Sequence, residues 1–158
     1  MAKDLSAPEG VKVLGSNKKA FYDYHVDDTI ECGIELQGTE VKSIKDNRLS
    51  FSDSYARIKD DELWVIGLHV SVYPFGNIFN HDPDRERKLL VHRQEIKRMR
   101  RRVDEKGFTL IPLRVYLKRG LVKLELGICK GKKMYDKREA IKARDQKRDA
   151  AREFRDRL

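Results

Sequence analysis

"LRVYLKRGLVKLELGI" (residues 113–128) is the stretch of the sequence that most clearly predicts its own structure. Apolar and polar side chains alternate along both halves of it, which is typical of strands with one buried face. Arg119 and Gly120 lie between the halves and predict a tight turn, so we expect a β-hairpin. The residues expected on its buried face are Leu113, Val115, Leu117, Val122, Leu124, Leu126 and Ile128. Those expected on its exposed face are Arg114, Tyr116, Lys118 and Lys123.

Three weaker strand signals precede this hairpin. They are "TIECGIEL" (29–36), "SYARI" (54–58) and "ELWVIGLHV" (62–70). Gly33 interrupts the first and marks either a bulge or the close approach of another segment. The second and third flank the polar stretch "KDDE", which predicts a turn and therefore a second hairpin.

Two further segments have helical periodicity. "TEVKSIK" (39–45) predicts a short helix, and "RQEIKRMRRRVDEKG" (93–107) predicts a longer one that ends at Gly107. The apolar residues that fall on one face of the longer helix are Ile96, Met99 and Val103. Short strands with inserted helices fit a mainly β fold, first a small closed barrel of the OB type and second an open α+β sheet.

Length and charge bound the organisation of the chain. Its 158 residues suit one domain with an appendage. We expect a flexible N-terminal segment (1–15), an OB-type barrel (16–130) and a basic C-terminal tail (131–158). The formal net charge of +9 favours a polyanion as partner.

The sequence also indicates the compartment. It has no run of 18 apolar residues and no apolar signal-peptide core at its start, so we expect a cytoplasmic protein with no membrane contact. Cys32 and Cys129 are not in a C-x-x-C pair. Buried reduced thiols are favoured in the cytosol, while a disulfide between the two stays open.

Motifs for catalysis or metal binding are missing from the sequence. None of the four histidines (His25, His69, His81 and His92) has the spacing of metal ligands, and we expect no cofactor. A small nuclease that uses Glu31 or Asp53 is an alternative resting on single carboxylates. A ribosomal protein of the OB type is another alternative.

Lysines and aromatic residues lie next to each other near the N-terminus. Lys18 and Lys19 precede Phe21, Tyr22 and Tyr24, and this combination suits phosphate contact with base stacking. Burial of the aromatic rings in the core is at least as good an interpretation.

The tail begins with "GKKMYDKREAIKARDQKR" (131–148). From residue 131 to 158 it holds 11 Lys or Arg against 6 Asp or Glu, a surplus of five positive charges. Its apolar residues are too sparse to bury a helical face. We therefore expect the tail to be disordered when free and helical against an anionic partner.

Five segments together resemble a known family. They are "NKKAFYDY" (17–24), "ECGIELQGTEVKSIKDN" (31–47), "SDSYARI" (52–58), "RERKLLVHRQEI" (85–96) and "GKKMYDKR" (131–138). The chain is similar to small protein B (SmpB), the family of tmRNA-binding proteins of bacteria.

The resemblance implies a function. It implies an OB-type barrel without enzymatic activity that binds the tRNA-like domain of tmRNA and delivers it to stalled ribosomes for trans-translation. The implied partners are tmRNA, the 30S subunit with its 16S rRNA and, indirectly, alanyl-tRNA synthetase and elongation factor Tu. We expect a monomer.

Site residues follow from the matching motifs and from the exposed hairpin face. The residues expected to contact tmRNA are Lys18, Lys19, Glu31, Leu90, Lys123, Arg114 and Tyr116. The tail residues expected at the small-subunit decoding centre and in the empty mRNA channel are Lys132, Lys133, Tyr135, Asp136, Lys137, Arg138, Ile141 and Lys142. Tyr135 stands where many family members carry His, and an aromatic stack on a ribosomal base survives that exchange.

Overall fold

The structure is a computed structural model that describes residues 6–75, 80–132 and 134–156; side chains of residues 134–137, 139–140 and 153–156 lie outside the description. The helices are α1 (Lys18–Asp23), α2 (Gly38–Lys45), α3 (Arg93–Lys106) and α4 (Met134–Asp156). The strands are β1 (Lys12–Ser16), β2 (Tyr24–Ile34), β3 (Leu49–Ser50), β4 (Tyr55–Lys59), β5 (Glu62–Ile66), β6 (His69–Val70), β7 (Arg87–Leu90), β8 (Thr109–Lys118) and β9 (Leu121–Gly131).

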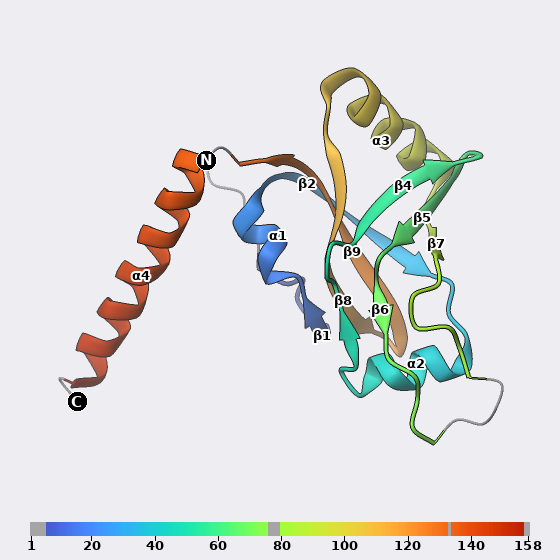
Figure 1. Cartoon of the computed structure of the whole chain (residues 1–158), viewed down its shortest axis with the longest axis horizontal. Helices are drawn as coiled ribbons and strands as arrows, with labels where there is room; N and C mark the ends of the chain where they lie inside the picture. Colours follow the sequence, from blue (N-terminus) through green and yellow to red (C-terminus); the bar gives the residue numbers. More distant parts are fainter. Residues whose placement is uncertain (1–5, 76–79, 133, 157–158) are drawn as a thin grey trace.

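The body of the molecule is a closed antiparallel sheet (Figure 1). Its strands follow the order β1-β8-β4-β5-β7-β2-β9, and β8 also pairs with β9. Strands β8, β4, β5, β7, β2 and β9 therefore form a ring, which confirms a mainly β fold with added helices. Helices α2 and α3 lie at opposite ends of the ring, and α4 projects away from it.

The hairpin from which the sequence analysis started is confirmed as β8 and β9. Arg119 and Gly120 form its turn with φ angles of 50° and 78°, the positive values that a two-residue hairpin loop of the primed type requires. The second predicted hairpin is β4 and β5. It turns at Asp60 and Asp61, which also have positive φ angles.

The prediction for the exposed face of the hairpin is wrong for Arg114 and Tyr116. Both are buried, and Tyr116 has no exposed surface. The pairing of β8 with β9 shifts between Pro112 and Arg114, and Leu113 packs in a second cluster beneath α1 instead of the barrel core. Alternation identifies the two faces of a strand but not what packs on the outer face, where Phe21 of α1 lies over Arg114 and β1 pairs beside Tyr116.

The sequence analysis missed helix α1. Asn17 caps it by accepting a hydrogen bond from the amide of Ala20 through Oδ1 (3.2 Å), as Asn often does at this position. The Asn17 side chain also donates to the carbonyl of Pro112 (2.9 Å), and its amide donates to the carbonyl of Leu113 (2.8 Å). One residue thus starts the helix and fixes it to β8.

Strands near the N-terminus extend beyond the predicted segments. Strand β1 pairs with β8, so residues 12–15 belong to the sheet instead of to a separate lead-in. Strand β2 begins at Tyr24, and its bulge lies between Val26 and Asp28. Gly33 marks a close approach, because an added Cβ would lie 3.1 Å from the Cβ of Leu90.

The two predicted helices, α2 and α3, are confirmed. In α3, Met99 is fully buried while Ile96 and Val103 pack against the core. Gly107 ends the helix in the left-handed conformation (φ 69°). The helix therefore covers one end of the ring with its apolar face.

Cys32 and Cys129 are free, buried thiols that lie in different apolar clusters. Burial raises the pKa of each thiol to about 12, so both are protonated at neutral pH. The interpretation as reduced core residues is confirmed.

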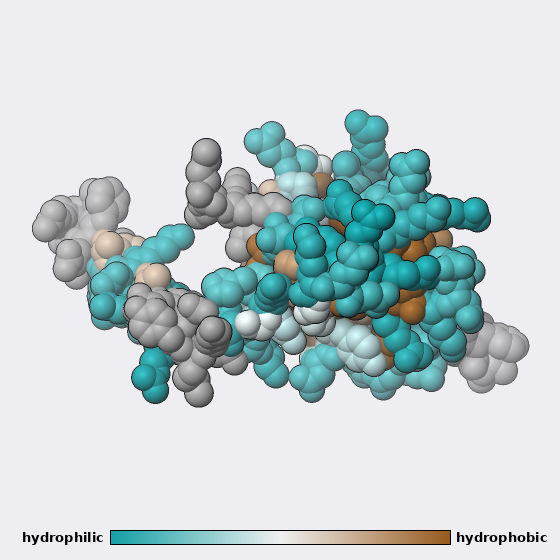
Figure 2. All heavy atoms as spheres, turned by 90° about the horizontal axis from the view of Figure 1, so that it is seen from above, coloured by the Kyte–Doolittle hydropathy of each residue, from teal (hydrophilic) through white to brown (hydrophobic). Residues whose placement is uncertain are grey.

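The tail forms one helix, α4, where we expected disorder in the free protein. Helix-forming residues dominate this segment, and Ile141 lies against α1, where it lines a small cleft with Phe21 and Tyr22. Polar side chains cover most of the molecular face in Figure 2. None of the described helices is long and apolar enough to cross a membrane.

Candidate nucleic-acid interface

Strand register brings three distant segments together on the outer face of the barrel. Gly33 on β2 pairs with Leu90 on β7 and with Lys123 on β9, which in turn pairs with Tyr116 on β8. Glu31 precedes Gly33 by two residues and lies on the same face of β2. We call Glu31, Leu90, Tyr116, Lys118 and Lys123 the outer row.

Glu31 lies at the centre of the hydrogen bonds in the outer row. Tyr116 donates its hydroxyl to Glu31 Oε2 (2.7 Å), and Lys118 Nζ lies 3.2 Å from the same oxygen. The tyrosine hydrogen bond, together with Lys118 and Lys123, holds the pKa of Glu31 below its ordinary value although partial burial opposes this. Glu31 is therefore ionised at neutral pH, and its charge is balanced by two lysines.

The exposed atoms of the outer row can contact RNA in different ways. Leu90 is 50% exposed and offers an apolar contact to a sugar or base face. Lys123 is half-buried and can reach a phosphate. The Glu31 carboxylate can accept hydrogen bonds from a base amino group or a 2′-hydroxyl.

Arg114 and Tyr116 support this surface from below. Arg114 donates to Glu125 (2.8 Å), and its guanidinium lies 4.9 Å from the ring centre of Phe21 on α1. Tyr116 is buried and directs only its hydroxyl to Glu31. Both act as positioning residues in this structure.

Lys18 and Lys19 are exposed on α1 and take no part in the outer row. Lys19 Nζ lies 3.4 Å from Asp53 Oδ1, and both side chains are largely exposed. Of the neighbouring aromatic residues, Phe21 and Tyr24 pack against the cluster beneath α1. The lysines predicted from the sequence to contact RNA therefore lie on different elements, Lys18 and Lys19 on α1 and Lys123 on β9.

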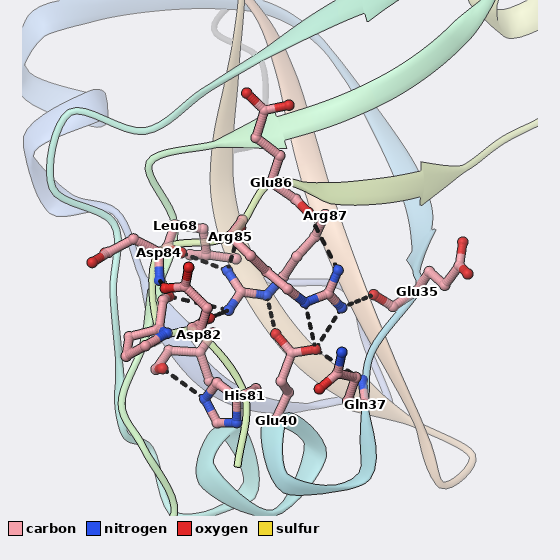
Figure 3. Close-up of polar contacts among 12 residues, drawn as sticks. Glu35, Gln37, Glu40, Leu68, His81, Asp82, Asp84, Arg85, Glu86 and Arg87 are labelled. Atoms are coloured by element: carbon pink, nitrogen blue, oxygen red, sulfur yellow. Dashed lines mark hydrogen bonds and ion pairs between the residues drawn. The ribbon is translucent and has the colours of Figure 1, made fainter. Parts of the chain in front are cut away.

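The sequence analysis missed a buried ionic network centred on Glu40 of α2 (Figure 3). Its carboxylate accepts hydrogen bonds from the guanidinium groups of Arg85 and Arg87 and from the amide of Gln37 (2.8 Å). Arg87 also donates to the carbonyls of Leu68 (2.7 Å) and Pro83 (3.1 Å). Burial disfavours the charge of Glu40, but these hydrogen bonds outweigh it and hold its pKa below the ordinary value.

This network fixes one end of β7, the strand that carries Leu90. Glu40 and Arg87 are fully buried and lie 47 positions apart. The acidic residue in "TEVKSIK" and the basic residues in "RERK" are visible in the sequence. No local spacing rule connects them, so only the fold reveals the pair.

The arginines of α3 are mainly engaged with the body. Arg98 pairs with Asp28 (2.8 Å), Arg100 with Asp61 (2.6 Å), and Arg102 with Asp27. Because these partners are carboxylates, the arginines anchor α3 as well as adding charge to the surface.

The first residue of the tail sites, Lys132, is bonded to α1. Its amide donates to the carbonyl of Asp23 (2.8 Å) and its ammonium to the carbonyl of Phe21 (3.2 Å). The exposed tail-site residues on α4 are Arg138, Ile141 and Lys142. Lys133 lies outside the described residues, as do the side chains of Tyr135, Asp136 and Lys137.

Histidines and carboxylates form no metal site in the described part of the chain, where no group of three or more suitable ligands occurs. His81 is buried and makes hydrogen bonds with Thr39 Oγ1 (2.8 Å) and the carbonyl of Val70 (2.8 Å). Its Nε2 donates to that carbonyl, and both ring nitrogens are therefore engaged within the fold. The two carboxylates considered for a nuclease, Glu31 and Asp53, each lie beside a lysine.

The SmpB family model, described as SmpB protein, matches residues 14–156 of this chain. The chain belongs to the SmpB family. It is 56% identical over 144 residues to the SsrA-binding protein of Treponema denticola, a match that covers 91% of this chain and 94% of the relative. It is 54% identical over 150 residues to that of Desulfitobacterium hafniense, covering 95% and 96%.

A solved SmpB-family structure has the same architecture. It is described as "tmRNA-SmpB: a journey to the center of the bacterial ribosome" and superposes with a TM-score of 0.65 at 40% identity. The match covers 84% of this chain and 94% of the solved chain. The sequence segments that resembled SmpB are thus part of a similarity over nearly the whole length.

Proposed function

We propose that this protein is an RNA-binding adaptor without catalytic activity, which binds the tRNA-like domain of tmRNA and delivers it to stalled ribosomes for trans-translation. The observation that carries the proposal is the outer row, in which Glu31, Leu90 and Lys123 meet in a chain of the SmpB family. Its relatives are named SsrA-binding proteins, and its solved neighbour is a tmRNA–SmpB structure of the bacterial ribosome.

The barrel is assigned to the OB type, and it acts in the cytoplasm as a monomer. The ring of short antiparallel strands with inserted helices supports the OB assignment. Alanyl-tRNA synthetase and elongation factor Tu act on the same RNA and are indirect partners. The curved body of a tRNA-like fold requires recognition by shape and backbone, for which an exposed lysine beside an apolar contact is suited.

Competition binding tests the adaptor function. The tRNA-like domain of tmRNA should bind in a gel shift in the presence of bulk tRNA as competitor, at a stated salt concentration. If bulk tRNA displaced the tRNA-like domain as well as the unlabelled domain itself does, the protein would bind RNA without preference for tmRNA, and the proposal would be contradicted.

The tail engages the small ribosomal subunit in this function. The tail (131–158) holds a surplus of five positive charges out of the nine of the whole chain, and its helix α4 has exposed basic residues along its length. The decoding centre and the empty mRNA channel are lined by 16S rRNA and offer a matching anionic surface.

Truncation after Gly131 tests the role of the tail. The truncated protein should bind the tRNA-like domain with nearly unchanged affinity but should not support peptide tagging on stalled ribosomes. Normal tagging by the truncated protein would remove the tail from the mechanism.

A further inference from the structure

Strand β4 diverges from β8 near α3. Its pairing with β8 consists of one residue pair, Ala56 with Leu110, whereas its pairing with β5 continues as far as Lys59. On the side of β8, residues 57–59 therefore have no partner strand in the described part of the chain. This end of β4 is a short open strand edge.

The register of the β4–β5 hairpin decides which backbone groups this edge offers. Asp60 and Asp61 have positive φ angles and form a two-residue loop that is closed by Lys59 and Glu62. In such a hairpin the closing pair directs its N–H and C=O groups at each other. Because these directions alternate along an antiparallel strand, the N–H and C=O of Ile58 are directed away from β5. Ile58 can therefore bond to an additional strand.

A groove of about 340 Å³ lies between this edge and α3, apart from the outer row. Its volume is within the roughly 300–1,000 Å³ usual for ligand sites. The ring of Phe108 forms part of its wall, with the guanidinium of Arg102 at 4.3 Å and the ammonium of Lys130 at 4.7 Å from the ring centre. The groove is large enough for an apolar side chain. Its apolar lining residues are Ala56, Ile58, Val103, Phe108 and Leu110, and its polar ones are Arg57, Arg100, Asp104 and Thr109.

The outward face of the same edge is basic. Arg57 and Lys59 are exposed and alternate with Ile58, which packs against the core. Arg57 lies 4.0 Å from Glu86 in a half-exposed pair, which contributes little and is easily exchanged. Across this face, acidic side chains would therefore be favoured.

We infer that the edge of β4 binds an extended segment of another protein as an added strand. An apolar side chain of that segment enters the groove, and the acidic residues next to it lie opposite Arg57 and Lys59. Main-chain hydrogen bonds at an open strand edge supply affinity, while the pocket for a side chain supplies specificity. Opposite charges across a strand pair add to both.

The chemistry of the edge favours a protein over an RNA strand as its partner. A nucleic-acid backbone has no ladder of N–H and C=O groups to match that of Ile58. Asp104 on α3 also lines the groove, and its charge would repel phosphates. The inference goes beyond the proposed function and does not depend on it, because the groove contains no residue of the outer row.

A synthetic peptide tests the site on the full chain. The probe is a blocked peptide of about seven residues, with phenylalanine at its centre, aspartate on both sides of it and serine elsewhere. It is added up to roughly 2 mM, and amide shifts are followed by ¹H–¹⁵N NMR. Amides at 56–59, 100–104 and 108–110 should shift in a saturable way.

Three control peptides separate the parts of the inference. Alanine in place of phenylalanine removes the anchor, and lysine in place of aspartate reverses the charge. N-methylation of the phenylalanine amide removes the donor that faces Ile58. Each control should bind roughly tenfold more weakly than the probe, because each loses one of the interactions that define the site.

Two variants of the protein test the same interactions from the other side. Arg57→Glu should weaken binding of the aspartate peptide roughly tenfold and strengthen that of the lysine peptide. Arg48→Glu, at an exposed arginine outside the groove, is the matched control and should change neither. Thr109→Trp places a ring over the groove from an exposed position and should weaken binding of the aspartate peptide without lowering the melting temperature.

Three results would overturn the inference. The first is an absence of saturable shifts at the groove. The second is equal binding of the probe and any one control peptide. The third is an Arg57→Glu variant that binds the peptide normally but binds the tRNA-like domain more weakly, which would assign this face to RNA. The gel shift of the unchanged protein is measured alongside, so failure here is distinguishable from failure of the proposed function.

Discussion

Glu31 and Glu40 are both glutamates bound by neighbouring cationic side chains, but they lie in opposite environments. Glu40 is fully buried between Arg85 and Arg87, whereas Glu31 is exposed beside Tyr116 and Lys118. A buried ion pair is costly to break because its partner is left charged and desolvated. An exposed carboxylate remains available to a ligand. The Glu40 site therefore maintains the fold, and the Glu31 site can bind RNA.

The largest effect is expected on stability, from a substitution that breaks the buried ion pairs of Glu40. Glu40→Gln leaves Arg87 charged without a full counter-charge, and should destabilise the protein by about 3–5 kcal/mol. Urea unfolding followed by circular dichroism measures the change. Glu86→Gln is the matched control, because Glu86 and Arg57 form a half-exposed pair at 4.0 Å, and it should cost less than about 1 kcal/mol. Similar losses for both variants would contradict the structural role of the network.

Lys123→Ala tests the exposed site and should lower the affinity for RNA while leaving the stability of the fold unchanged. Loss of one phosphate contact should weaken binding of the tRNA-like domain about tenfold and reduce the slope of log affinity against log salt by about 1. Thermal unfolding should be unchanged, because Lys123 is only half-buried. Lys59→Ala, an exposed lysine on β4, is the control. A fall in stability without a fall in affinity would reverse our assignment.

The acid sensitivity of the two carboxylates should differ as well. The folded-state pKa of each lies below the ordinary value of 4.5, so each contributes stability above that pH and loses it as the pH falls through the folded pKa. The contribution of Glu40 should dominate because it is buried. Stability measured between about pH 3 and 6 should therefore flatten in Glu40→Gln and keep its slope in Glu31→Gln. The same slope in both variants would argue against this ranking.

The smallest effect is expected from Tyr116→Phe. The change removes the hydrogen bond that contributes most to the lowered pKa of Glu31, so that pKa should rise. Carboxyl ¹³C titration by NMR measures it. RNA affinity should fall only a few-fold, because Lys118 still holds the carboxylate. An unchanged pKa would show that the hydroxyl does not position Glu31.

Local sequence patterns predicted elements whose residues are close in sequence. The β8–β9 hairpin, α2, α3 and the end of α3 at Gly107 followed from periodicity and turn chemistry. The burial of Arg114 and Tyr116 did not follow from local patterns. Arg114 lies beside Phe21 of α1, nearly 100 positions away, and Tyr116 pairs with Val13 of β1 and bonds to Glu31. Asn17 was a visible signal for this short helix, although six residues are too few to have a clear period.

The candidate site also has residues that the sequence predicted and contacts that it did not. Glu31, Leu90 and Lys123 were predicted from their motifs, and strand register brings them together. The pairing of Glu40 with Arg87 was not predictable from local spacing, because it is a tertiary contact between two ordinary charged residues.

Helix α1 connects the start of the tail to the barrel wall. Its carbonyls hold Lys132 at the start of the tail, and its Phe21 ring lies over Arg114 in the barrel wall. The exit direction of α4 is consequently set by the same short helix that seals the sheet. A substitution that tilts α1 would therefore redirect the tail relative to the barrel.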